Sequence, residues 1–99
     1  MKDLFELALG IRSPWFIDMI KMDINSCRMD ITIKFKTDAK FEYVSDDKEI
    51  IEKFSHFDTI LMTWKYLNFF QYECHLHCNV PLLKLKNGVI HQIRVPFSR

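Results

Sequence analysis

The alternation of apolar and polar residues predicts that most of this chain is β-sheet. Residues 15–24 read as one strand, and a second strand at 28–36 follows the turn sequence INSC. In the second strand the side chains predicted to face the core are Met29, Ile31, Ile33 and Phe35. The two segments are therefore expected to form a β-hairpin.

Three further segments, residues 59–67, 69–85 and 89–97, also read as extended chain. Asn87-Gly88 lies between the last two, and this dipeptide favours a two-residue hairpin turn of the primed type. We therefore predict a second hairpin there.

Apolar residues at helical spacing predict two short helices. The first lies in residues 1–11, with the apolar positions Leu4, Phe5, Leu7, Ala8 and Ile11, and Gly10 followed by Ser13-Pro14 ends it. The second covers residues 46–57, with Ser45 or Asp46 as its N-cap and the apolar positions Ile50, Ile51, Phe54 and Phe57. Together the patterns predict an α+β fold with a mostly antiparallel sheet of about five strands.

Composition is consistent with one folded domain spanning residues 1–99. With 48% hydrophobic residues the chain can bury a modest core. No apolar run approaches the roughly 20 residues that cross a bilayer, so no membrane role is expected. Three cysteines form an odd set and the N-terminus does not resemble a signal peptide, which favours a cytoplasmic protein with reduced thiols.

The net charge of +1 conceals an uneven distribution. Residues 38–58 carry seven acids and three lysines, whereas residues 74–99 carry four basic residues and no acid. A basic C-terminal part permits a polyanionic partner without requiring one.

The sequence CHLHC at residues 74–78 suggests a metal site, but strand geometry argues against it. In a strand Cys74 and Cys78 face one side while His75 and His77 face the other, so the four cannot converge on one ion. Two partial alternatives stay open: His75 and His77 with Glu73, or the two cysteines with Cys27. Buried free cysteines and solvated histidines are the commoner outcome, and we expect no metal or other cofactor.

A catalytic site is not expected either. Neighbouring cysteine and histidine residues point apart in a strand, and with only two glycines the chain offers no glycine-rich loop for an oxyanion hole.

The segments LFELALGIRSPWFI, TWKYLNFFQYECHLHCNVP and VIHQIRVPFSR resemble the N-terminal domain of the ISL-three family of bacterial insertion-sequence transposases. The matching positions are Trp64, Leu67, Phe70, Tyr72, Cys74, Leu76, Val80, Pro81, Val95 and Pro96, with near-substitutions at Lys65, Tyr66, Asn68 and Phe97. The resemblance implies a zinc-ribbon-like domain that recognises the DNA ends of a mobile element.

The chain departs from this family in two ways. Tyr43, Asp46 and Leu85 stand where the zinc-binding thiolates would be, so the resemblance implies a degenerate zinc ribbon without metal. The sequence also ends at VPFSR, before the helix-turn-helix and the DDE-type catalytic domain that follow in such transposases. We therefore expect a recognition module without enzymatic activity.

Double-stranded DNA is the partner that this resemblance implies. The candidate contact residues are Lys65, His75, His77, Asn79, Lys84, Lys86, Gln92, Arg94 and Arg99. A second group of side chains can either stack on unpaired bases or pack in the core: Trp64, Tyr66, Phe69, Phe70 and Tyr72. Two other functions stay open, namely a protein-interaction or regulatory domain that uses a sheet edge, including self-association, and an inert relic of a mobile element.

Overall fold

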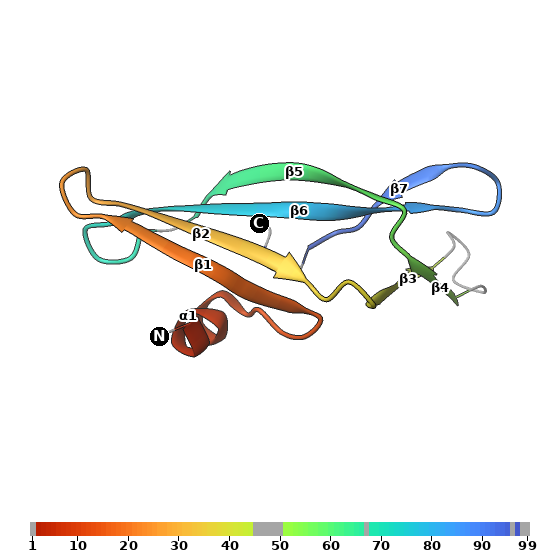
Figure 1. Ribbon diagram of the computed structural model, residues 1–99, viewed down its shortest axis with the longest axis horizontal. Coiled ribbons are helices and arrows are strands. Elements are labelled where there is room, and N and C mark those ends of the chain that lie inside the picture. Colours follow the sequence, from red (N-terminus) through yellow and green to blue (C-terminus); the bar gives the residue numbers. More distant parts are fainter. Residues whose placement is uncertain (1, 45–50, 67, 96, 98–99) are drawn as a thin grey trace.

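The computed structural model describes residues 2–44, 51–66, 68–95 and 97, and Figure 1 shows an elongated molecule of 50 × 24 × 21 Å. Within these described residues one helix precedes seven strands. In chain order they are α1 (Lys2–Leu9), β1 (Trp15–Asp23), β2 (Arg28–Phe35), β3 (Lys40–Val44), β4 (Ile51–Ser55), β5 (Asp58–Lys65), β6 (Glu73–Lys84) and β7 (Ile90–Gln92). The helix is too short to cross a bilayer, and the described residues contain no helix that could.

The main sheet is mixed, with the strand order β1-β2-β6-β5 and with β7 also paired to β6. Strands β1 and β2 form the predicted antiparallel hairpin, whereas β2 and β6 run parallel. Leu82 pairs with both Asp58 and Gln92, so β5 and β7 flank β6 on opposite sides at that point. The parallel pair differs from the mostly antiparallel sheet predicted above, because nothing local in the sequence specifies a partner 45 residues away.

The core lies on one face of this sheet. Ile31, Ile33 and Leu76 have no exposed surface, and Cys74 and Cys78 are equally buried beside them. Residues of α1 and of the segment 93–97 join the same cluster, which places both on the core face. The ring of Phe97 lies 5.7 Å from that of Trp15 on β1 and 5.6 Å from that of Trp64 on β5. It therefore contacts both strands on the core face of the sheet.

The second predicted helix, residues 46–57, is wrong over its described part. Residues 51–55 form β4, which pairs with β3 as a separate two-stranded sheet in which Phe54 lies opposite Phe41. Cross-strand pairing buries Phe41 and Phe54 more effectively than a short isolated helix would, so tertiary context overrides the local pattern. The proposed cap at residues 45–46 lies outside the described residues.

The hairpin at Asn87-Gly88 is confirmed, but its turn differs from the prediction. Gly88 N donates to Leu85 O at 2.9 Å, and Leu85 N donates to Val89 O at 2.9 Å. The loop therefore has three residues, and only its last, Gly88, has a positive φ of 84°. This is the arrangement of a type I turn followed by a bulge, so glycine is needed at the bulge and Asn87 keeps an ordinary φ.

The predicted strand from residue 69 begins later, at Glu73, because residues 69–72 form a tight turn. Phe70 has a φ of 54° in this turn. A left-handed backbone costs a residue with a side chain about 1–2 kcal/mol. Trp64, Tyr66, Phe69 and Tyr72 pack against the core as expected of core aromatics, whereas Phe70 is 94% exposed.

Candidate functional site

The face of the sheet opposite the core carries polar side chains from β2, β5 and β6, and we call it the open face. The register of the parallel strands β2 and β6 places Asp30 beside His75 and Thr32 beside His77. On the other side of β6, Lys65 lies opposite His75 and Thr63 opposite His77. Its members on β2, β5 and β6 are Arg28, Asp30, Thr32, Lys34, Thr63, Lys65, Glu73, His75, His77 and Asn79.

A chain of four side chains crosses three strands on the open face. Arg28 donates from Nε and Nη2 to the carboxylate of Asp30, each at 3.0 Å. His77 Nε2 donates to the same carboxylate at 2.7 Å, and the Thr63 hydroxyl lies 3.1 Å from His77 Nδ1. Because a carboxylate only accepts, Nε2 of His77 carries a proton, and Nδ1 is left to share a hydrogen bond with the Thr63 hydroxyl, which can donate or accept. The hydrogen bond from Arg28, supported by that from His77, lowers the pKa of Asp30 to about 2.

A second cluster surrounds Glu73. His75 Nε2 donates to Glu73 Oε1 at 2.9 Å, and Lys65 Nζ lies 3.4 Å from the same oxygen. The hydrogen bonds from His75 and then Lys65 hold the pKa of Glu73 below its usual value. Lys34 is similarly paired with Asp18 at 3.3 Å. Arg28, Lys34 and Lys65 are therefore each compensated by a carboxylate, and the open face is polar without being strongly basic.

The predicted DNA-contacting residues fall into three groups. Lys65, His75, His77 and Asn79 lie together on the open face. Lys84 and Lys86 lie at the β6–β7 hairpin, where Lys86 Nζ is 3.2 Å from Glu52 Oε1. Gln92 and Arg94 line a cavity of about 270 Å³ beside Trp64 and Val80. Arg99 lies outside the described residues.

Arg28, Asp30 and Thr63 were not among the predicted DNA-contacting residues, although alternation had placed Asp30 on the polar face of its strand. The same alternation within β2 and β5 assigns Arg28 and Thr63 to polar strand faces. What could not be read was the parallel pairing of β2 with β6, which brings Asp30 to His77.

Neither partial metal site is formed. Among the described residues no group of three or more His, Cys, Asp and Glu side chains is arranged to hold a metal ion. Cys74 and Cys78 face the core about 13 Å apart along β6, and burial raises the pKa of these thiols to about 11 and about 12. His75 and His77 instead bond to two different carboxylates.

The β3–β4 and β6–β7 hairpins meet at the end of the molecule seen on the right in Figure 1. The rings of Tyr43 and His91 are 5.0 Å apart in an edge-to-face contact. The ion pair between Glu52 and Lys86 forms a second link between the hairpins. An aromatic contact and an ion pair thus join the two hairpins.

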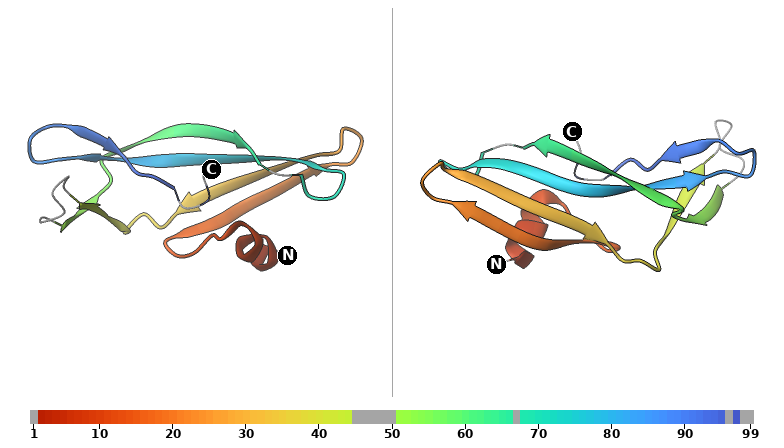
Figure 2. Two further views of the ribbon diagram at one scale, coloured as in Figure 1. Left: turned by 180° about the vertical axis from the view of Figure 1, so that it is seen from behind. Right: turned by 45° about the horizontal axis from the view of Figure 1, so that its top comes forward.

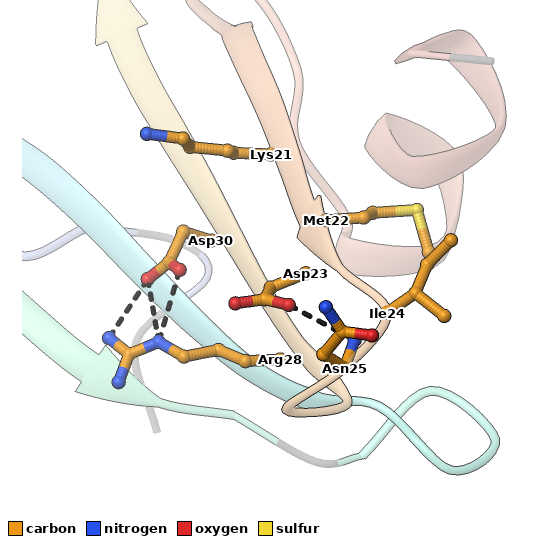
Figure 3. A pocket seen from close by; sticks show the side chains of 7 residues that line it. All are labelled: Lys21, Met22, Asp23, Ile24, Asn25, Arg28 and Asp30. Atoms are coloured by element: carbon orange, nitrogen blue, oxygen red, sulfur yellow. Dashed lines mark hydrogen bonds and ion pairs between the residues drawn. The ribbon is translucent and has the colours of Figure 1, made fainter.

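A cavity of about 730 Å³ lies beside the β1–β2 turn and is open to solvent. Figure 3 shows Arg28 held by Asp30 on one side of β1, while Met22 and Ile24 point to the other. The polar and apolar lining residues therefore do not converge on one point, and the cavity lacks the shape of a small-molecule site.

Comparisons of the chain with family models, with curated proteins and with solved structures find no match.

Proposed function

We propose that this protein is a non-catalytic DNA-binding module that contacts duplex DNA through the open face. The observation that carries the proposal is the placement of Lys65, His75, His77 and Asn79 side by side on the sheet face opposite the one against which Leu9, Val95 and Phe97 pack. The resemblance to the end-recognition domain of ISL-three transposases supports the same partner. The described cysteines are all unpaired, which fits a role in the cytoplasm.

The ion pairs on the open face determine how strongly it would bind DNA. Lys65 and Arg28 already have carboxylate partners, so a phosphate must compete with Glu73 or Asp30 for them. Binding therefore gains less electrostatic free energy than at a purely basic patch, and the remaining attraction depends on released counterions. We expect modest affinity that falls as salt is added, with a shallow slope because few phosphates are neutralised, and with Asn79 available to reach a base edge.

Fluorescence anisotropy of a labelled duplex at two salt concentrations tests this proposal. The duplex is the end of an adjacent insertion element, and a scrambled duplex is the reference. Lys65→Ala should weaken binding, whereas Lys84→Ala, which removes the same charge from outside the open face, should not. Equal losses in both variants would move the contact surface away from the open face, and no binding by the unmodified protein would refute the proposal.

Strand β1 favours a second candidate, contact with another protein through a sheet edge. It is an outer strand of the main sheet, and Met19 and Met22 on it are about half exposed. Glu6 closes part of this edge because its carboxylate accepts from Ile17 N at 2.8 Å. Self-association that persists at high salt in sedimentation velocity would favour this function over DNA binding.

A further inference from the structure

The turn between β5 and β6 presents one aromatic ring to solvent. Phe69 N donates to Tyr72 O at 3.0 Å and Tyr72 N donates to Phe69 O at 2.8 Å, so Phe70 and Gln71 form a two-residue loop. Phe70 has a positive φ and Gln71 does not, which is the pattern of a type II′ turn. Glycine is the residue usually found at the position that Phe70 occupies.

Packing against the described residues does not account for the Phe70 side chain. It is 94% exposed, so burial contributes almost nothing that would offset the backbone strain. The adjacent Phe69 behaves differently, because its ring packs edge-to-face on Phe5 of α1 at 5.2 Å. Phe69 therefore anchors the turn. The Phe70 ring points into solvent, where it is available to contact another molecule.

The residues around Phe70 indicate which kind of molecule its ring contacts. Asn68 and Gln71 beside it are exposed amides, and residues 68–72 contain no acid. Figures 1 and 2 both show the β5–β6 turn at the same end of the sheet as the β1–β2 turn. A hydrogen bond joins the two turns, because Glu73 N donates to Cys27 O at 2.8 Å. Lys65 and Arg28 lie where β5 and β2 reach this end.

We propose that Phe70 is an aromatic wedge that stacks against a nucleobase at an opened or unpaired base step, with Asn68 and Gln71 within reach of base edges. Apolar wedges on narrow β structures enter DNA in this way, and amide side chains pair with base edges. The inference rests on the proposed function, since the open face would hold the neighbouring phosphates.

Duplex DNA containing 2-aminopurine, whose fluorescence rises when it unstacks, provides the test. The unmodified protein should raise this fluorescence, and Phe70→Gly should abolish the rise and weaken binding roughly tenfold. Phe70→Trp should preserve both. The control is Phe57→Ala, which removes a half-exposed phenylalanine immediately before β5, away from the turn, and should change neither. Because glycine suits the backbone at position 70, Phe70→Gly should fold at least as stably as the unmodified protein.

The outcomes separate the two proposals. Salt-sensitive binding by the unmodified protein with an unaffected Phe70→Gly variant would overturn the wedge and leave the proposed function intact. Absence of binding to both duplex and single-stranded DNA would overturn both. Loss of self-association, rather than of DNA binding, in Phe70→Gly would also overturn the wedge by assigning the ring to a protein contact.

Discussion

His77 Nε2 lies 2.7 Å from a carboxylate oxygen of Asp30, although 47 residues separate them in the chain. The contact joins β6 to β2, the pair of strands that runs parallel in the main sheet. Arg28 and Thr63 extend it to four side chains on three strands. This chain of hydrogen bonds both stabilises the sheet and orients the imidazole on the open face.

Asp30→Asn should destabilise the protein at neutral pH. The pKa of Asp30 is about 2 in the folded protein, against about 3.9 in an unfolded chain. This difference corresponds to at most about 2.5 kcal/mol, and solvent screening on the open face reduces it to roughly 1 kcal/mol. Urea unfolding measured by circular dichroism at pH 7 gives the loss of unfolding free energy in Asp30→Asn.

The pH dependence of the unfolding free energy checks whether the ionised Asp30 carboxylate causes this stabilisation. Because folding lowers the pKa, the stabilisation is complete above about pH 4 and is lost as the pH falls through about 2. The difference between the unmodified protein and Asp30→Asn should shrink over that range. Asp18→Asn, which breaks the more exposed pair with Lys34, is the control and should cost less than about 0.5 kcal/mol. Equal costs for the two variants would contradict a special role for Asp30.

The three thiols should differ in reactivity. Cys74 and Cys78 are buried with the pKa raised to about 11 and about 12, so at pH 8 almost no thiolate forms at either site. Cys27, partly exposed in the β1–β2 turn, should be the only one alkylated by iodoacetamide in the folded protein, and all three should react in denaturant. Peptide mass spectrometry identifies the modified positions. Rapid native labelling of Cys74 or Cys78 would show that the core opens there.

Two leucines on neighbouring strands test which face of the sheet is the core. Leu76 has no exposed surface, and Leu76→Ala should cost about 3 kcal/mol of unfolding free energy because it leaves a cavity. Leu61 on β5 is 67% exposed, and Leu61→Ala should cost less than about 0.5 kcal/mol. Thermal and urea denaturation of both variants measure the contrast. A large loss in Leu61→Ala would mean that the open face is covered in solution.

Tyr43→Ala should loosen the end of the molecule where the two hairpins meet. The β3–β4 pair has two strands, and such a sheet is marginal unless it packs on something else. Hydrogen exchange should therefore accelerate in residues 51–55 and 90–92 while β2 and the first half of β6 stay protected. Lys53→Ala, which removes a solvated ion pair from the same hairpin, should leave exchange unchanged. Sensitivity of the unmodified protein to a zinc chelator would instead indicate that a metal joins the hairpins.

Local patterning was enough to predict the elements whose signals are local. The helix at residues 2–9, the β1–β2 hairpin and the turn near Gly88 all follow from spacing, alternation and turn residues within a few positions. The two-faced character of β6 was also predictable, because alternation alone separates Cys74 and Cys78 from His75 and His77. That separation was sufficient to reject a metal site through all four residues.

Tertiary structure decided the rest, for two physical reasons. Residues 51–55 carry spacing that suits a helix, yet they form a strand because β3 offers a cross-strand partner that burial favours. The open face depends on β2 lying parallel to β6, and a parallel pairing between distant segments has no local sequence signal. The sequence by itself thus determined which residues share a strand face, whereas only the packed sheet determined that Asp30, His77 and Thr63 meet and that Phe70 is left in solvent.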